Sequence, residues 1–201
     1  MLDDPVVGAF AAMASALFVT ELTDKDALLI LTLSARVRAR NVFLAGSTAF
    51  IITTAIIVTL GAFLLVFIPI FWVRLAGGTA MIAYGLWQAR GLVGQKVLEK
   101  EESRLQSQTN GWRSFFAMVG ALVLLDLAGD ATEILTIVFV AHYADALLVF
   151  VACCVGLIAA VAFETALGNR LGRVITPTRI RYASMVIFLG LGSYVVILGF
   201  L

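Results

Sequence analysis

Two clusters of carboxylates lie in the middle of long apolar segments, and they constrain this chain more than any other feature. The first cluster spans 21–26 and the second spans 126–133; their acidic residues are Glu21, Asp24 and Asp26, and Asp126, Asp130 and Glu133. A carboxylate at bilayer depth costs about 3 kcal/mol even on lenient insertion scales, so such residues usually line a polar pathway or bind a cation. The two clusters lie about 105 residues apart, which indicates that one kind of site occurs twice in the chain.

The composition places the chain in the membrane. Of its 201 residues 62% are hydrophobic and 13% are charged, whereas soluble domains keep about a quarter of their residues charged. The chain therefore has too little charge to cover itself in water, and a soluble enzyme or binding module is excluded. The net charge of +1 gives no indication of a nucleic-acid partner.

Six apolar segments are long enough to cross a bilayer, which needs about 20 residues each. They lie near 5–35, 42–68, 71–91, 112–140, 146–169 and 180–200. The first and fourth are longer than needed and carry the acidic clusters, so each is expected to be tilted or interrupted there. The predicted fold is an all-α membrane protein with six transmembrane helices.

The two halves of the chain resemble each other at an offset of 105 to 107 residues. Residues 16–22 match 121–127, Leu60-Gly61 matches Leu167-Gly168, and Gly85 matches Gly192. We predict a first three-helix repeat at 1–94, a cytoplasmic linker at 95–111 and a second repeat at 112–201. Because three spans is an odd number, the second repeat must be inverted, an arrangement that recurs among secondary transporters.

The basic residues predict the orientation. Twelve of the fourteen Lys and Arg residues fall in the first, third and fifth connections, all on one side of the predicted bundle. The positive-inside rule then places both termini outside the cytoplasm. The acidic start at Asp3 and Asp4 is unlike a cleavable signal, so we expect the first span to be retained. The absence of an organellar targeting segment favours a prokaryotic plasma membrane.

The clusters carry the ligands of a hard cation. On a regular helix Asp126, Asp130 and Glu133 share a stripe about 60° wide, while Glu21, Asp24 and Lys25 cover about 100°. Thr32 lies on the Glu21 face as an auxiliary oxygen ligand, and Asp26 points to another surface or marks a break. If the two helices cross at their clusters, these carboxylates converge. Oxygen ligands without histidine or thiolate favour Ca²⁺, Mn²⁺ or Mg²⁺.

Charge compensation is expected at Lys25 and Glu164. Lys25, four residues after Glu21, either neutralises a carboxylate of the empty site or forms a structural ion pair that holds the first helix to its partner. Glu164, alone in its span, either extends toward the cytoplasmic end of its helix or acts as a ligand or proton relay. Crowded, desolvated carboxylates favour their protonated form, so protons and metal would compete for one site.

Cys153 and Cys154 are adjacent within an apolar run. Neighbouring cysteines in such a run do not suggest a disulfide framework. Their simplest interpretation is as small core residues, and the alternative is a pair of soft metal ligands.

The clusters resemble the paired E-x-G-D-[KR]-[TS] motifs of a cation/proton exchanger family, the Gdt-like family of the lysine-exporter superfamily. Residues 21–25 match the first motif except for Thr23 in place of glycine, and Asp26 replaces the hydroxyl residue. Residues 129–132 match the second motif, with Asp126 as its upstream acid and Ala131 in place of the basic residue.

The resemblance implies exchange of Mn²⁺ or Ca²⁺ for protons, with the two motifs facing each other. It implies that Glu21 and Asp24 are ligands from the first copy, that Asp130 is the counterpart of Asp24, and that Asp126 approximates the counterpart of Glu21. Asp26 and Glu133 make this site more acidic than the family pattern, which allows a different ion preference, a second ion or a different number of protons.

We therefore predict a secondary transporter that exports a divalent cation, Mn²⁺ or Ca²⁺, against protons by alternating access at a midplane site. The alternatives are an exporter of a small cationic organic molecule such as a basic amino acid, or a cation channel. No span holds a histidine and no HExxH or serine-histidine pattern is present, which argues against an enzyme. The expected partners are metal ions, protons and the bilayer, with a homodimer as one option and no cofactor or nucleic acid.

Overall fold

The computed structural model describes residues 5–22, 24–89, 112–127, 131–143 and 145–171, and eight further positions between 186 and 197. Within these residues the chain forms helices and no strand. The helices are α1 (Pro5–Glu21), α2 (Lys25–Arg36), α3 (Ala39–Phe67), α4 (Ile70–Ala89), α6 (Trp112–Asp126), α7 (Ala131–Tyr143) and α8 (Ala146–Leu171). The predicted linker at 95–111 lies outside the described residues.

Both predicted spans that carry an acidic cluster are interrupted at that cluster. Helix α1 ends at Glu21 and α2 begins at Lys25, with the backbone N–H of Asp24 donating to the carbonyl oxygen of Glu21 at 2.9 Å. Helix α6 ends at Asp126 and α7 begins at Ala131. The predicted interruptions are confirmed, and the assignment of cluster side chains to faces of one regular helix is wrong because the helical spacing stops at each break.

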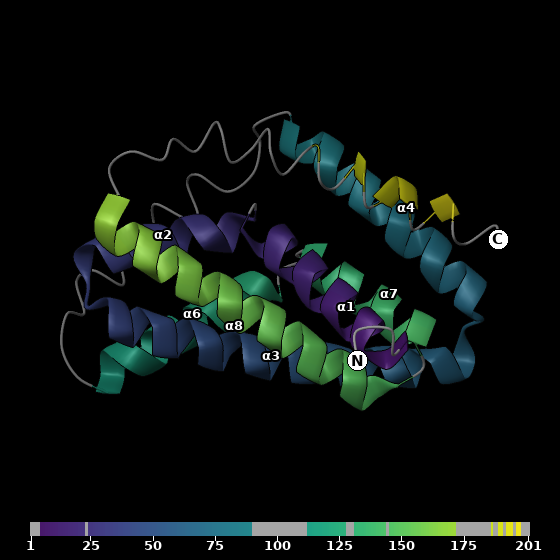
Figure 1. The fold of residues 1–201 in the computed structure, drawn as a ribbon, viewed down its shortest axis with the longest axis horizontal. Helices are drawn as coiled ribbons and strands as arrows, with labels where there is room; N and C mark the ends of the chain where they lie inside the picture. Colours follow the sequence, from purple (N-terminus) through teal and green to yellow (C-terminus); the bar gives the residue numbers. More distant parts are fainter. Residues whose placement is uncertain are drawn as a thin grey trace.

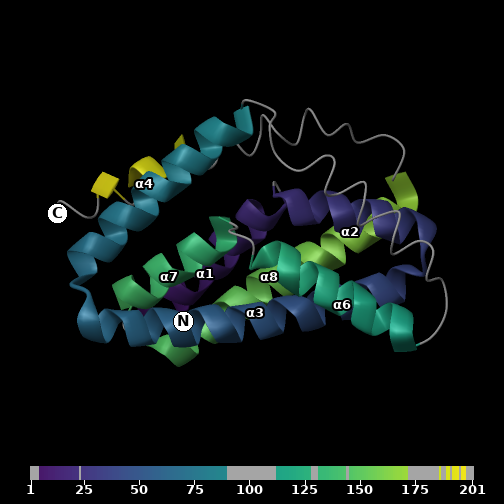
Figure 2. The same ribbon diagram turned by 180° about the vertical axis from the view of Figure 1, so that it is seen from behind.

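The long helix of each half packs on the broken helix of the other half. Helix α8 contacts both α1 and α2, and α3 in turn contacts both α6 and α7. The path from α1 to α2 runs along the long axis in the direction opposite to the path from α6 to α7 (Figures 1 and 2). Each broken helix thus packs on the unbroken helix of the other half, as two copies of opposite orientation would.

A matched pair of glycines repeats this contact. Gly61 on α3 faces Val140 on α7, and Gly168 on α8 faces Ser34 on α2. A Cβ atom at Gly61 would meet Val140 at 3.6 Å, which is an ordinary contact. At Gly168 a Cβ atom would overlap the backbone oxygen of Leu31, so only glycine lets α8 approach α2 this closely.

The outer surface suits lipid. Two described helical stretches, Ala39–Phe67 and Ala146–Gly168, are long and apolar enough to cross a membrane. Their outward faces expose large apolar side chains, including Leu60, Phe63 and Val66 on α3 and Val155 and Phe163 on α8. The other predicted spans correspond to α4, to the two interrupted helix pairs and to the segment near 180–200, of which few residues are described. The total of six spans stays a prediction.

Candidate functional site: carboxylates at two helix breaks

The break between α1 and α2 holds three fully buried carboxylates. Glu21, Asp24 and Asp26 each have 0% of their surface exposed. Glu164, on α8, is 1% exposed, and together these four residues form what we call the first half-site. Four buried acids in one place are costly unless protons or cations balance their charge.

Glu164 belongs to the first half-site because of how α8 is placed. Its carboxylate interacts electrostatically with those of Glu21 and Asp24. Gly168 lies one turn away and packs directly on α2, while Gly156 packs on the backbone of α1. The structure therefore favours a role inside the site over the alternative in which Glu164 extends toward the helix end.

Neither carboxylate oxygen of Glu21 or of Glu164 accepts a hydrogen bond within the described part of the chain. A buried carboxylate without donors loses its hydration and gains nothing in return. Such a group is stable when it holds a proton or lies beside a cation, which makes these two side chains candidates for the site.

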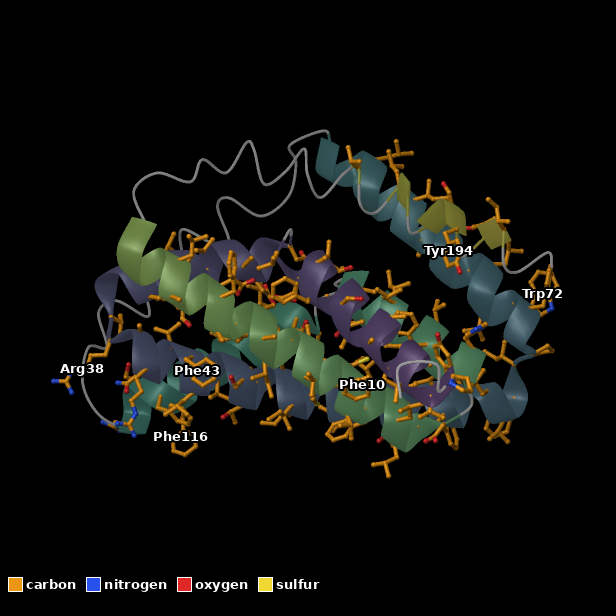
Figure 3. All side chains as sticks on the ribbon, in the orientation of Figure 1. Phe10, Arg38, Phe43, Trp72, Phe116 and Tyr194 are labelled. Atoms are coloured by element: carbon orange, nitrogen blue, oxygen red, sulfur yellow. The ribbon has the colours of Figure 1, made fainter. Side chains whose placement is uncertain are left out.

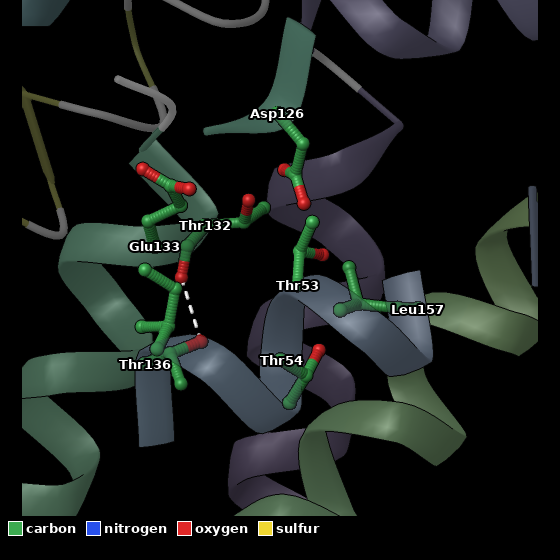
Figure 4. Close-up of a pocket in the computed structure, with 8 residues that line it drawn as sticks. Thr53, Thr54, Asp126, Thr132, Glu133, Thr136 and Leu157 are labelled. Atoms are coloured by element: carbon green, nitrogen blue, oxygen red, sulfur yellow. Dashed lines mark hydrogen bonds between the residues drawn. The ribbon is translucent and has the colours of Figure 1, made fainter. Parts of the chain in front are cut away.

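The break between α6 and α7 forms the second half-site around a small cavity. Asp126 is 3% exposed at the last residue of α6, and the partly buried Glu133 lies in the first turn of α7. The space open to the centre of a water-sized sphere is about 10 Å³, which suits one water molecule or one ion. Its lining residues are Thr53, Thr54, Ile57, Asp126, Thr132, Glu133, Thr136 and Leu157 (Figure 4).

The hydroxyl groups of the second half-site can act as ligands. The Thr136 hydroxyl donates to the carbonyl oxygen of Thr132 at 2.7 Å. The Thr53 hydroxyl donates to the carbonyl oxygens of Ala49 and Phe50 at 3.3 Å. Because each proton points toward its own helix, the lone pairs of the hydroxyl oxygen stay available to a cation in the cavity.

The two half-sites are electrically linked. The carboxylate of Glu21 interacts with that of Asp126, as well as with Asp24, Asp26 and Glu164. Among the described residues, however, no three acidic, histidine or cysteine side chains are grouped closely enough to hold one metal ion. Binding an ion would therefore require the carboxylates to move together or to gain a ligand from outside the described residues.

The predicted site residues divide into three groups. The structure brings Glu21 within electrostatic reach of both Asp24 and Asp126, and it places Glu133 beside Asp126 at the cavity. Asp130 and the side chain of Lys25 lie outside the described residues. Thr32 donates its hydroxyl to the Leu29 carbonyl oxygen at 3.1 Å and does not line the cavity.

Several residues of the two half-sites were not predicted from the sequence. These are Thr53, Thr54 and Thr136. For Thr53 and Thr54 the available signal was a pair of adjacent hydroxyl residues inside an apolar run at 51–57. For Asp26 the sequence left open another surface or a break, and the structure buries it beside the break, in the first half-site.

A family model describing the divalent cation/proton antiporter GDT1 matches the chain twice, over residues 9–95 and 114–200. The two matches cover most of the chain and correspond to its two repeated halves, one acidic helix break in each. No curated protein and no solved structure matches the chain. The repeated match, the paired breaks and the apolar helices agree, and the chain belongs to the GDT1 family of divalent cation/proton antiporters.

Proposed function

We propose that the protein exports Mn²⁺ or Ca²⁺ from the cytoplasm in exchange for protons, by alternating access at a midplane site between its two half-sites. The observation that carries this proposal is the burial of Glu21 among four other carboxylates from three separate helical segments. Six spans in two inverted repeats would let one repeat rock against the other around that site.

The ligands we propose are Glu21, Asp24, Asp126, Asp130 and Glu133. Carboxylate oxygens are the preferred ligands of hard divalent cations, and several can surround one Ca²⁺. Lys25 and Glu164 would compensate charge or carry protons, and Thr32 stays an auxiliary oxygen ligand.

Exchange follows from the electrostatics of the site. The buried carboxylates cannot all be ionised at membrane depth unless a cation lies among them. When the cation leaves, protons must replace part of its charge, and when it returns they must leave. A site of this kind couples metal movement to proton movement in the opposite direction.

The cavity supports a metal ion over an organic cation. The space that it leaves for the centre of a water-sized sphere is about 10 Å³, and none of the described residues that line it is aromatic. A pocket for an organic ammonium group would be wider and would use aromatic faces.

The arrangement of the helix ends supports the proposed orientation. Arg38 lies at one end of the long axis and Trp72 lies at the opposite end (Figure 3). A basic end facing the cytoplasm, with both termini outside, agrees with the positive-inside rule. A prokaryotic plasma membrane and a homodimer stay predictions.

Uptake into proteoliposomes tests the proposal, with Mn²⁺ and Ca²⁺ supplied in turn and internal pH recorded together with the metal. Asp24→Asn and Asp130→Asn should both abolish metal uptake. Asp145→Asn is the matched control, because Asp145 is exposed and accepts a hydrogen bond from the Leu148 N–H at the start of α8, a role asparagine can fill.

Metal uptake coupled to opposite proton movement, and lost in both site variants, would establish the exchanger. Metal uptake that ignores the proton gradient would indicate a channel. No metal uptake, with both site variants identical to wild type, would indicate the organic-cation alternative.

A further inference from the structure

Three arginines lie at one end of the bundle, where α3 and α6 begin. Arg38 directly precedes α3, Arg40 lies in its first turn, and Arg113 lies in the first turn of α6; all three are exposed. Helices α3 and α6 pack against each other, and Arg38 lies at the same end of the long axis as Phe116 of α6 (Figure 3). Both repeats therefore contribute to one basic surface, which we call the arginine patch.

The length of α3 sets the depth of the arginine patch in the membrane. Helix α3 has 29 residues and spans about 43 Å, which matches the thickness of a bilayer with its headgroups. Its middle residue, Thr53, lines the cavity together with Asp126 of α6. Arg40 precedes Thr53 by 13 residues. Arg113 precedes Asp126 by the same number. Both arginines therefore lie about 20 Å from the middle of the membrane, at the level of the lipid headgroups.

Exposed apolar side chains lie one turn below the arginine of each helix. Leu44 follows Arg40 by four residues and is 43% exposed, and residues four apart share one face of a helix. Phe116 follows Arg113 by three residues and is 64% exposed. Leu124 lies three turns after Arg113 on the same face and is 72% exposed. The surface thus has positive charge at headgroup depth and apolar side chains toward the midplane, which complements an anionic phospholipid.

The carboxylates of the described residues do not neutralise the arginine patch. Those of the first half-site are at most 1% exposed, so they lie inside the bundle, whereas the three arginines are exposed. Asp126 and Glu133 lie at the cavity, and Asp145 accepts a hydrogen bond from a backbone N–H at the start of α8. Within the described part of the chain, the patch keeps a positive charge that an anion from outside can balance.

We propose that the arginine patch binds the headgroup phosphate of an anionic phospholipid in the cytoplasmic leaflet. A guanidinium group can donate two parallel hydrogen bonds to phosphate oxygens. Each basic residue near the surface strengthens the attraction to anionic lipid by about fivefold. Leu44 and Phe116 would contact the acyl chains. A zwitterionic lipid has no net negative charge to offer, so the patch selects for anionic headgroups.

A lipid bound at the arginine patch would join the two repeats. Arg38 and Arg40 belong to the first repeat, and Arg113 belongs to the second. The lipid would stabilise the arrangement of α3 and α6 in which all three arginines reach one headgroup, because it binds that arrangement more tightly than others. This inference requires that α3 crosses the membrane, and it does not depend on the exchange of metal for protons.

Lipid binding is measured on the purified full-length protein in a neutral detergent. Native mass spectrometry counts the lipids that stay bound after dioleoyl-phosphatidylglycerol or dioleoyl-phosphatidylcholine is added. We expect the wild type to bind the anionic lipid at least about tenfold more tightly. The triple variant Arg38→Gln/Arg40→Gln/Arg113→Gln should lose this preference. Equal binding of both lipids by the wild type, or an unchanged preference in the triple variant, would overturn the proposal.

Single variants locate the site. Arg113→Gln should weaken phosphatidylglycerol binding about fivefold, and Phe116→Ala should weaken it about threefold by removing an acyl-chain contact. Arg74→Gln is the matched control, because it removes one arginine from α4, the helix that carries Trp72 at the opposite end (Figure 3). Equal losses in Arg74→Gln and Arg113→Gln would indicate a general effect of net charge and would overturn the site.

Inorganic phosphate distinguishes a lipid site from a site for a free anion. When it replaces chloride at constant ionic strength, lipid binding should not change, because inorganic phosphate has no acyl chains for Leu44 and Phe116 to contact. Displacement of the lipid would overturn the lipid assignment.

Thermal unfolding in detergent provides a second readout of lipid binding. Without added lipid, the wild type and the triple variant should have the same Tm, since the three substituted side chains are exposed. Phosphatidylglycerol should raise the Tm of the wild type alone, because a ligand stabilises the folded protein that binds it. An equal rise in both proteins would contradict the proposal. Neither readout needs transport, so a failure of the exchanger proposal would leave both results interpretable.

Discussion

The two half-sites have the same arrangement of helices and differ in the side chains that they hold. Both lie where a helix breaks, and both face an unbroken helix of the opposite repeat. The first gathers four carboxylates with at most 1% exposure. Among its described residues, the second has one buried carboxylate, Asp126, and one partly buried carboxylate, Glu133, with threonine hydroxyls and two apolar side chains around them.

Matched positions show where the difference arises. At the offset that relates Gly61 to Gly168, Glu164 on α8 corresponds to Ile57 on α3. At the offset that relates Asp24 to Asp130, Asp26 corresponds to Thr132. Among the described residues, the first half-site therefore holds four carboxylates, and the second holds two, Asp126 and Glu133, beside neutral threonine oxygens. We expect the first to provide most of the affinity for a divalent cation.

The strongest test of this asymmetry compares Glu21→Gln with Asp126→Asn. Glu21 lies among four acidic neighbours, so its loss should weaken Mn²⁺ affinity by about 100-fold, or ~2.7 kcal/mol. Asp126→Asn should weaken it by only about tenfold. The KM for uptake into proteoliposomes measures both, and equal losses would show that the half-sites contribute alike.

The matched glycines compare how tightly the two half-sites are packed. Gly168→Ala should destabilise the protein by about 1–3 kcal/mol, because the added Cβ atom would collide with the backbone of α2. Gly61→Ala should have little effect, since its Cβ atom would make ordinary contacts with Val140.

Thermal unfolding in detergent measures the difference between these variants. Gly120→Ala provides the baseline, because nothing lies within 4 Å of the added atom. A Tm for Gly168→Ala equal to that of the other two variants would contradict the close approach of α8 to α2.

The carboxylate of Glu164 on α8 can be removed, and a new one can be placed at the matched position, Ile57 on α3. Glu164→Gln should weaken cation affinity about tenfold, since it removes one charge beside Glu21 and Asp24. Adding Ile57→Glu should restore part of that affinity by placing the charge in the second half-site. Thr165→Val is the control, because the Thr165 hydroxyl bonds to its own helix at 2.7 Å. Unchanged affinity in Glu164→Gln would exclude Glu164 from the site.

The smallest expected effect concerns the neutral oxygens. Thr53→Val should raise the KM for Mn²⁺ about twofold to threefold, equal to ~0.5 kcal/mol, because it removes one weak ligand and no charge. Thr59→Val, a substitution at an exposed position of the same helix, should leave the KM for Mn²⁺ unchanged. An effect of Thr53→Val as large as that of Glu164→Gln would place the main binding site in the second half-site.

The sequence predicted the parts of this site that follow from strong costs. Carboxylates at membrane depth are so unfavourable that Glu21, Asp24 and Asp126 were expected to share a polar environment. The two spans that carry them are longer than a bilayer requires, so a break near the carboxylates was expected as well. Angles on a regular helix could not predict Asp26, since the break itself turns the chain. The threonines gave too weak a signal, because a hydroxyl in a membrane helix often bonds only to its own backbone.

The exchanged packing of α8 on α1 and α2, and of α3 on α6 and α7, has a consequence for biosynthesis. A ribosome makes α1, α2 and α3 long before the helices that cover them exist. Their small-residue contacts, such as the one at Gly168, become available only after α8 has been inserted. The first repeat must therefore wait in the bilayer with the three carboxylates of its helix break incompletely covered, and final assembly depends on completing nearly the whole chain.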